Sequence, residues 1–441
     1  MHAESNVLGA IGTVNPGDTS LLLISAALVL LMTPGLAFFY GGLVRHKNVL
    51  TIMLQSFISM GIVTVLWVVC GFSLAYGPDH GGIIGDFTYI GLRDVGMTPG
   101  PSPYAPTTPF LAFFLFQLMF AIITPALITG AFADRVGFKA YLWFLVIWSF
   151  LVYIPFVHWI WGGGFLQHWG AHDFAGGMVV HLSSGMAALA SVFVVGSRIF
   201  RQNENRLPNN IPFVALGAGL LWFGWFGFNG GSELAANGQA AVAFVNTNTA
   251  ASVGMVTWLF IAWWHTGKAS MSGALTGAVA GLATITPAAG FVPTWAALSI
   301  GFAAGAVCYL ACQFRLRMKW DDALDVWGVH GVGGALGTIL TGVFAIASIN
   351  GMSGLIDGDA HQFGIQIGAV AITATYAFVV TFIILKVIGM FMAVRVSEGI
   401  ERDGLDDALH GEAAYQPLPV MVAGVDGGGV SSEEMATPGV Q

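Results

Sequence analysis

Charge is scarce in this chain. Asp, Glu, Lys and Arg together make up 9% of the 441 residues, whereas apolar residues make up 56%. A soluble domain could not cover its surface with so few charges, so an ordinary water-soluble fold is excluded. Cysteine is also rare. Cys70, Cys308 and Cys312 all lie in apolar runs, and we expect small buried side chains there rather than a disulfide.

Long stretches of the chain contain no charged residue at all. The stretches 19–44 and 49–77 each exceed the ~20 residues that a helix needs to cross the hydrocarbon of a bilayer. Similar runs follow as far as residue 385. They predict an all-α integral membrane protein with 11 transmembrane helices, near residues 18–43, 50–76, 109–133, 140–161, 174–197, 211–232, 243–266, 270–287, 292–314, 325–348 and 362–394.

The positive charges test this helix count, because Lys and Arg collect in cytoplasmic loops. Fourteen of the fifteen fall on one side of the predicted topology, and only Arg93 falls on the other. The bias predicts an exterior N-terminus and a cytoplasmic C-terminus in a multi-pass protein of the cell membrane. The start shows no cleavable signal peptide, so either the first helix is a signal anchor or processing has already occurred.

The predicted helices divide the chain into segments. We expect an exterior segment at 1–17, a transmembrane domain at 18–396, a cytoplasmic regulatory tail at 397–416 and a disordered extension at 417–441. The Gly/Pro-rich segment 77–108 suits an ordered exterior loop. The formal charge of −8 gives no reason to expect a nucleic-acid partner.

Two histidines, His181 and His330, lie inside long apolar segments, each a few residues after an aspartate, Asp173 or Asp325. Ionisable groups at membrane depth are costly and usually mark a substrate or proton path. Five predicted helices separate the two segments, which would therefore cross the membrane in opposite directions. This pattern predicts two inverted five-helix repeats, at about 18–200 and 207–350, followed by a final C-terminal helix.

Neutral imidazoles can pass hydrogen bonds along a row, because one ring nitrogen donates and the other accepts. His181 and His330 could therefore offer a small polar molecule a path that a hydrated ion lacks. Two alternatives remain: each histidine could be a satisfied core residue, or the pair could bind a metal. Two histidines alone are a poor ligand set, and we expect no metal and no cofactor.

Aromatic residues crowd the predicted exterior ends of several helices. The cluster comprises Phe116, Phe120, Trp161, Trp225 and Phe228, with Ser232 beside them. An interfacial aromatic belt and a cation-binding cage use the same residue types, and spacing does not decide between them. Asp173 could cap the helix that follows it, attract cations electrostatically, or do both.

Several motifs resemble, in order, those of the ammonium transporter family (Amt/Mep/Rh), and the Amt/Mep branch more than the Rh branch. They are DFAGGMVVHLSSG (173–185), TPGLAFFYGGLVRHKN (33–48), WFGFNGGS (225–232), AFVNT (243–247), DVWGVHGVGG (325–334) and ERDGLD with HGEAAY (401–415). The resemblance implies transport of ammonium or ammonia, no enzymatic activity, and a homotrimer with one pore in each subunit.

The resemblance also implies roles for individual positions. It places an outer ammonium site at Trp161, Phe120 and Ser232, with Trp225 close by and Asp173 as the nearby carboxylate. It places a stacked gate at Phe116 and Phe228, an ammonia or proton relay at His181 and His330, and inner carboxylates at Asp321, Asp322 and Asp325. His168 and His172 depart from the family pattern. We expect exposed loop histidines, with tuning of the vestibule by His172 as the alternative.

The alternatives to an electrogenic transporter are an ammonium sensor that signals through its tail and an electroneutral Rh-like channel. An intramembrane enzyme is more distant, because no nucleophile and base accompany the histidines. The tail motif implies docking of a PII-type signalling protein at the cytoplasmic face.

Overall fold

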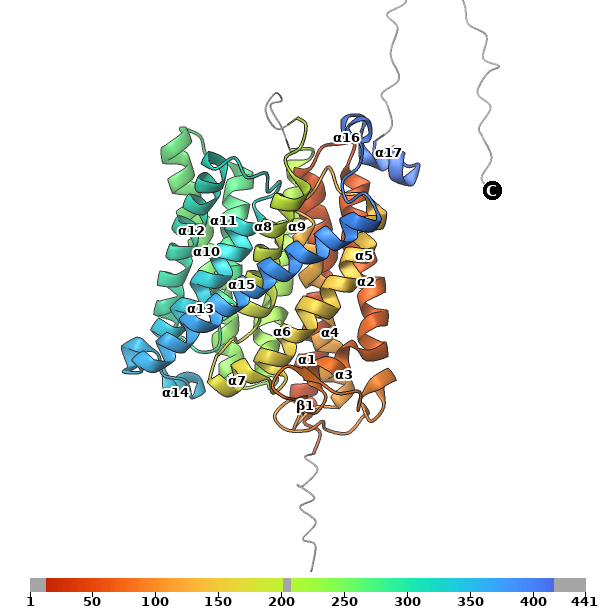
Figure 1. Ribbon diagram of the computed structural model, residues 1–441. Helices are drawn as coiled ribbons and strands as arrows, with labels where there is room; N and C mark the ends of the chain where they lie inside the picture. The colour runs from red at the N-terminus through yellow and green to blue at the C-terminus, as the bar shows by residue number, and fades with distance from the viewer. Residues whose placement is uncertain (1–12, 201–207, 416–441) are drawn as a thin grey trace, which may run out of the picture.

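The computed structural model describes residues 13–200 and 208–415, so the predicted extension at 417–441 lies outside the described residues. The chain forms a bundle of long helices with the start of α1 at one end and the short helices α16 and α17 at the other (Figure 1). We call these ends the N-face and the C-face. Successive long helices run between the two faces in alternating directions, as the charge-free runs predict.

The first half contains five helical rods. They are α1 (Pro16–Leu43); α2 (Val49–Leu66), η1 (Trp67–Gly71) and α3 (Phe72–Tyr76); α4 (Phe110–Ile128); α5 (Phe138–Trp148), η3 (Ser149–Tyr153) and α6 (Ile154–Trp161); and η4 (Gly177–Leu182) with α8 (Ser183–Val195). The N-face loops carry β1 (Asp79–His80), β2 (Ile84–Gly85), η2 (Ile90–Leu92) and α7 (Phe165–Trp169). Segment 77–108 is thus an ordered loop with one short antiparallel hairpin.

The second half repeats this arrangement, and one long helix follows it. Its rods are α9 (Ile211–Gly230) with η5 (Gly231–Glu233), α10 (Gly238–Thr266), α11 (Met271–Ile285), α12 (Thr294–Arg317), and η6 (Trp327–Gly331) with α13 (Val332–Phe344). Short helices α14 (Ala347–Asn350) and η7 (Leu355–Asp357) precede α15 (Ala360–Phe391), and α16 (Glu398–Asp403) and α17 (Leu405–His410) end the described chain. The predicted eleven rods are confirmed, and within the described residues eight are long and apolar enough to cross a membrane by length and composition.

Asparagine and proline start several rods. The Asn15 side chain accepts hydrogen bonds from the backbone N–H groups of Gly17 and Asp18, and Pro16 occupies the first helical position of α1. Asn210 caps α9 in the same way. These side chains satisfy N–H groups that have no partner within the helix.

Glycine lets the two halves approach closely where α1 crosses α9. A Cβ atom on Gly217 would lie 2.3 Å from the backbone nitrogen of Phe39, so only glycine fits at this contact. Small residues at such crossings allow the backbone-to-backbone packing typical of membrane helices. Helix α15 then crosses the outside of the bundle at a steep angle and spans both halves (Figure 1).

The predicted tail is partly helical and docks on the C-face. The Asp406 carboxylate accepts hydrogen bonds from the backbone N–H groups of Leu50 and Thr51, at the start of α2. Arg395 forms an ion pair with Glu401 at 2.7 Å. Arg45 donates to the backbone oxygen of Glu401. The tail therefore contacts the loop between the first two rods.

Candidate functional site

His181 and His330 meet at the centre of the bundle. Their Nδ1 atoms are 3.2 Å apart and their rings stack with centroids 5.2 Å apart, and both side chains are buried. A hydrogen bond between two Nδ1 atoms requires one to carry a proton and the other to accept it. When both rings are neutral, the first ring therefore has a bare Nε2 and the second has an Nε2–H. The pair presents one acceptor and one donor.

Both histidines lie on π-helical turns, η4 and η6, which open a standard α-helix by one residue. Single π-turns concentrate at functional sites because they redirect side chains that α-helical geometry would place elsewhere. Glycine again allows the close approach of the two segments. A Cβ atom on Gly185 would lie 2.1 Å from the backbone nitrogen of Gly331.

The histidines line a narrow cavity of about 20 Å³ whose other walls are largely apolar. Its remaining lining residues are Met32, Leu36, Phe39, Tyr40, Ile123, Leu127, Val180, Leu221, Trp225, Phe228 and Val279. This volume has room for about one small molecule. The Nε2 atom of His181 is buried and has no hydrogen-bond partner among the described residues. We call this space the histidine cavity.

Trp225 lies deeper than we expected from the sequence. Instead of joining an outer site, it lines the histidine cavity and stacks on His181 with centroids 5.3 Å apart. Its indole N–H donates to Thr286 at 2.9 Å, which fixes the ring against the imidazole. Trp225 thus lines the histidine cavity and not the N-face cavity, a depth that helix position alone does not give.

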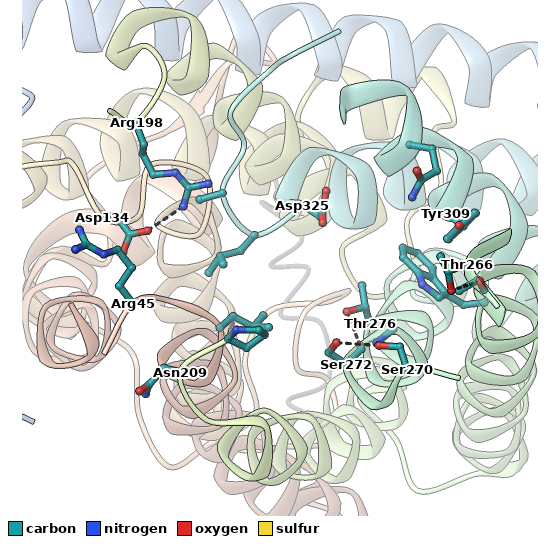
Figure 2. Close-up of a pocket in the computed structure, with 18 of the residues that line it drawn as sticks. Arg45, Asp134, Arg198, Asn209, Thr266, Ser270, Ser272, Thr276, Tyr309 and Asp325 are labelled. Atoms are coloured by element: carbon teal, nitrogen blue, oxygen red, sulfur yellow. Dashed lines mark hydrogen bonds and ion pairs between the residues drawn. The ribbon is translucent and has the colours of Figure 1, made fainter. Parts of the chain in front are cut away.

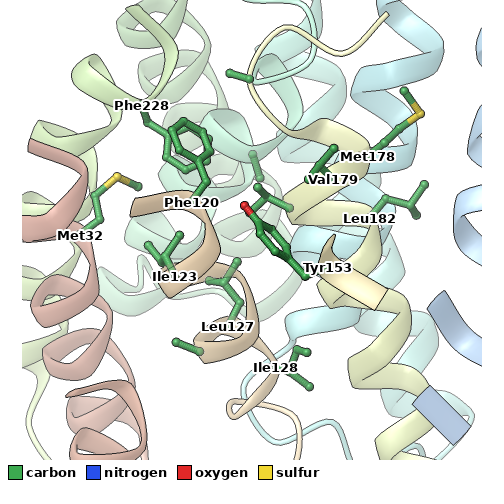
Figure 3. Packing of buried hydrophobic residues seen from close by; sticks show 14 of the residues in the cluster. Met32, Phe120, Ile123, Leu127, Ile128, Tyr153, Met178, Val179, Leu182 and Phe228 are labelled. Carbon is green, nitrogen blue, oxygen red and sulfur yellow. The ribbon is translucent and has the colours of Figure 1, made fainter. Parts of the chain in front are cut away.

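The phenylalanine that packs against Phe228 also differs from the one expected from the sequence. The ring centroids of Phe120 and Phe228 lie 4.2 Å apart (Figure 3). Phe116 contacts Phe120 edge-on, with ring centroids 4.9 Å apart. Phe120, rather than Phe116, therefore packs against Phe228, with the two ring planes tilted by 38°. Phe120 lines a cavity on the N-face side and Phe228 lines the histidine cavity, so the pair separates the two spaces.

The N-face cavity has a volume of about 160 Å³ and collects three residues that the sequence placed together. Phe120, Trp161 and Ser232 all line it. The hydroxyl of Ser232 donates to the backbone oxygen of Phe228 at 2.8 Å, which leaves its lone pairs available to accept. The ring of Trp161 lies edge-on to that of Phe120, with centroids 6.1 Å apart.

Asp173 does not line the N-face cavity. Its buried carboxylate accepts hydrogen bonds from the backbone N–H groups of Gly176, Gly177, Met178 and Val179, at 2.6–3.1 Å. Burial raises the pKa of this carboxyl, and the four N–H groups act in the opposite direction. The contacts are those of a cap on η4.

Asp173 also contacts a residue that lines the N-face cavity. Its backbone oxygen accepts the indole N–H of Trp161 at 2.7 Å. The residue therefore orients one ring of the cavity wall through its main chain, while its side chain holds the start of the helix that carries His181. His168 is exposed, whereas His172 is partly buried against Phe291, and burial lowers its pKa. Neither histidine lines the N-face cavity.

On the C-face, Asp322 occupies the place in the second half that Asp173 occupies in the first. It is fully buried, and its Oδ2 atom accepts the backbone N–H of Trp327, the first residue of η6. Its Oδ1 atom has no hydrogen-bond partner among the described residues. Burial is the main cause that raises the pKa of Asp322 to about 6. The sequence pattern had instead paired Asp325 with Asp173.

Asp325 and Asp321 have other partners. Asp325 forms an ion pair with Arg315 at 2.7 Å and lines a wide C-face cavity of about 850 Å³. Arg198 forms an ion pair with Asp134 at 2.8 Å at the edge of that cavity (Figure 2). Arg198 also forms an ion pair with Asp321 at 2.7 Å. The hydrogen bonds and charge of Arg198 lower the pKa of Asp321, although burial opposes them.

Sequence reasoning missed Gln117 as a lining residue of the N-face cavity. Its side chain is 8% exposed, and its Oε1 atom has no hydrogen-bond partner among the described residues. A signal was present, because Gln117 is an isolated amide in an apolar helix, between Phe116 and Phe120.

Two inverted helical halves thus enclose a narrow cavity with paired imidazoles, with a larger cavity toward each face. This combination of fold and site defines a multi-pass membrane transport protein. A model of the Ammonium Transporter Family matches residues 20–415, and the chain belongs to that family. Ammonium transport is the function that the comparisons support.

Relatives cover nearly the whole chain. An ammonium transporter of Bacillus subtilis is 48% identical over 404 residues, which are 91% of this chain and 98% of the relative. Ammonium transporter Amt1 of Archaeoglobus fulgidus is 46% identical and covers 91% of this chain and 100% of its own. The crystal structure of Saccharomyces cerevisiae Mep2 matches with a TM-score of 0.81 at 33% identity, covering 87% of this chain and 88% of its own.

Proposed function

We propose that the chain recruits NH₄⁺ at the N-face cavity, removes its proton and conducts NH₃ past His181 and His330 toward the C-face. The observation that carries this proposal is the Nδ1–Nδ1 contact of the two histidines at 3.2 Å, inside a cavity that is otherwise largely apolar. The N-face is then exterior, the C-face cytoplasmic, and the membrane the cell membrane, in keeping with the Lys/Arg bias of the sequence.

The N-face cavity supplies the groups that a small cation needs. The ring faces of Phe120 and Trp161 attract a cation by about 0.5–2 kcal/mol each. The hydroxyl proton of Ser232 is already committed to a backbone oxygen, so its lone pairs can accept an N–H from ammonium. Asp173 holds Trp161 in place and adds negative charge nearby.

The packed rings of Phe120 and Phe228 block the passage of a hydrated ion. Entry requires a cation to shed its water, and no group in the histidine cavity replaces a full hydration shell. Ammonium can give up its charge as a proton, whereas K⁺ cannot. Deprotonation at this point therefore selects ammonium over K⁺.

The histidines then receive a neutral molecule that both donates and accepts hydrogen bonds. NH₃ accepts a hydrogen bond from the Nε2–H of one imidazole and donates one to the unprotonated Nε2 of the other. The released proton passes to the imidazole pair or along a water-linked route and rejoins ammonia at the C-face. Transport is then electrogenic. The electroneutral Rh-like alternative differs only in returning the proton to the N-face.

Assembly and regulation complete the proposal. The protein forms a homotrimer in the bilayer with one path in each subunit, and the docked tail presents a surface to a PII-type signalling protein. A sensor role is the alternative: a structure titled Sensor Amt Protein matches with a TM-score of 0.83 at 30% identity, covering 89% of this chain and 98% of its own. Capture of the matching PII-type protein by the purified trimer at low 2-oxoglutarate tests the regulatory part.

Growth rescue tests transport itself. A strain that lacks ammonium uptake, supplied with this protein, is grown at low ammonium and controlled pH. We expect the wild type to restore growth and His181→Ala at equal membrane abundance to fail. Failure of the wild type to rescue, with the protein present in the membrane, would contradict a transport role and leave the sensor alternative.

A further inference from the structure

Three aromatic rings form a second wall of the N-face cavity, apart from Phe120 and Trp161. Tyr76 and Phe113 meet edge-on with centroids 4.9 Å apart, and Tyr104 lies 5.3 Å from Tyr76 and 5.9 Å from Phe113, onto which it stacks. All three residues line the cavity. Tyr104 comes from the loop before α4, whereas the other two come from transmembrane rods. Two rings of this wall therefore come from transmembrane rods, and the third comes from the loop.

Two buried polar atoms beside these rings have no hydrogen-bond partner among the described residues. They are Oε1 of Gln117 and the hydroxyl oxygen of Tyr76. The two side chains are 8% and 1% exposed, and both residues line the N-face cavity. Leaving buried polar groups unpaired is costly, so such atoms normally meet a ligand or an ordered water. An amide oxygen is an acceptor and therefore suits a donor with N–H groups.

The loop that carries Tyr104 is firmly tied to the bundle. Gly100 donates its backbone N–H to Ala105 at 2.9 Å, Phe110 donates to Thr98 at 3.0 Å, and Asn15 donates to Thr107 at 2.7 Å. The Tyr104 ring is consequently a fixed part of the cavity wall. A loop held this way can set the size of what enters.

The other side of the cavity mouth leaves space for the Tyr104 hydroxyl. A Cβ atom on Gly163 would lie 3.5 Å from that oxygen, and Gly163 has a φ of +90°, which favours glycine. Gln167 holds this turn by accepting the N–H of Gly163 at 2.8 Å. Burial raises the pKa of Tyr104 to about 12, so the hydroxyl stays neutral and can both donate and accept.

We propose that Tyr76, Tyr104, Phe113 and Gln117 form an upper subsite for a small protonated amine, and that Tyr104 limits how many alkyl groups the cation carries. The inference rests on the proposed function. The whole N-face cavity measures about 160 Å³, which is shared between this subsite and the cage of Phe120 and Trp161. Each added methyl group consumes space against Tyr104 and removes one N–H that Gln117 could accept.

Competition between amines tests the subsite. Ammonium-evoked current is measured in proteoliposomes of the full chain, with methylammonium, dimethylammonium and tetramethylammonium as competing or replacing cations. Tyr104→Ala removes the ring, Tyr104→Phe removes only the hydroxyl, and Gln117→Leu removes the acceptor. Met97→Ala is the matched control, because Met97 belongs to the same loop segment and is 83% exposed.

We expect Tyr104→Ala to raise the ratio of methylammonium to ammonium flux about tenfold, since a change of one methyl-sized space in a pocket has that order of effect. Its half-saturation concentration for ammonium should rise about threefold through loss of one ring face. Tyr104→Phe keeps the ring packing and should keep the size discrimination. Gln117→Leu should raise the half-saturation concentration without changing the preference for size.

Two results would overturn the inference. One is a Tyr104→Ala protein whose affinity and amine preference match those of Met97→Ala. The other is a Tyr104→Phe protein that loses size discrimination while remaining folded and active, because the ring would then not be the limiting element. Absence of any ammonium current in the wild type would instead overturn the proposed function, so the two failures are distinguishable.

Discussion

The two halves of the bundle hold their histidines with equivalent carboxylates in different states. Asp173 caps η4 and accepts four backbone N–H groups, so both of its oxygens are satisfied. Asp322 caps η6, but one of its oxygens is buried without a partner in the described part of the chain. The Asp173 carboxylate therefore supports the helix with both oxygens hydrogen-bonded, whereas the protonation of Asp322 depends on its surroundings.

The N-face and C-face cavities also differ, in both size and charge. The N-face cavity is small and largely aromatic, and the C-face cavity is several times larger and carries Arg45, Lys47, Arg198 and Asp325. An inverted repeat therefore need not give equivalent entrances. Under the proposed function, the small aromatic cavity is the side that selects the cation and the wide charged cavity is the side that releases it into water.

The largest loss of folding stability should follow from Asp173→Asn. The amide offers one acceptor oxygen and places an NH₂ group against N–H donors, so about two backbone groups lose their partner. At 1–3 kcal/mol each, the loss of stability is on the order of 4 kcal/mol. Thermal unfolding in detergent measures it, with exposed Asp94→Asn as the control. Equal melting of the two variants would mean that the cap does not support η4.

We expect Asp322→Asn to have a smaller effect on folding stability than Asp173→Asn, and to increase the stability at neutral pH rather than decrease it. Burial raises the folded-state pKa of Asp322 to about 6, above its usual value, so the folded state binds the proton more tightly. Folding stability therefore falls as the pH rises through about 4–6, by on the order of 3 kcal/mol, and the deficit persists above pH 6. The Asp322→Asn variant should not show this decrease in folding stability with rising pH.

Melting of the wild type and of Asp322→Asn at pH 4.5 and pH 7.5 checks this prediction. The difference between the two proteins isolates the contribution of Asp322 from that of other titrating groups. Parallel pH profiles would show that Asp322 is as fully satisfied as Asp173, and the contrast between the halves would then disappear.

The smallest effect should come from Asp325→Asn, at the edge of the C-face cavity. The Asp325 side chain is 31% exposed, and Arg315 retains a hydrogen bond to the backbone oxygen of Trp320. The residue has a φ of +60°, which asparagine tolerates. We expect a loss of about 1 kcal/mol or less. Destabilisation as large as that of Asp173→Asn would instead make Asp325 the structural counterpart of Asp173.

The helical rods were predictable because absence of charge is a long-range signal. The expected helix at 18–43 is Pro16–Leu43 in the structure, and the expected helix at 362–394 is Ala360–Phe391. The charge-free run marks both limits of the first helix and the start of the last, whereas the last helix continues past Lys386 to Phe391. The start of α10 was less accurate, at Gly238 rather than 243, because a polar Asn237 cap was not recognised.

The details of the site were less accessible for a physical reason. The π-turns of η4 and η6 shift the side-chain register, and nothing in a simple hydrophobic pattern reports such a shift. The partner of Phe228 and the depth of Trp225 depend on how helices from both halves cross. Motif order brought Phe120, Trp161 and Ser232 together in one cavity, whereas tertiary contacts were needed to recognise Asp322 as the cap of η6.

The role of the imidazole pair is the central claim, and current recording tests it most directly. Proteoliposomes on a supported membrane receive jumps of ammonium or K⁺, with wild type, His181→Ala, His330→Ala and the exposed-histidine control His168→Ala. We predict an ammonium current in wild type and His168→Ala, no K⁺ current in either, and at least about tenfold less ammonium current in the two cavity variants. Folded His181→Ala and His330→Ala proteins that carry ammonium at the wild-type rate and still exclude K⁺ would contradict the account.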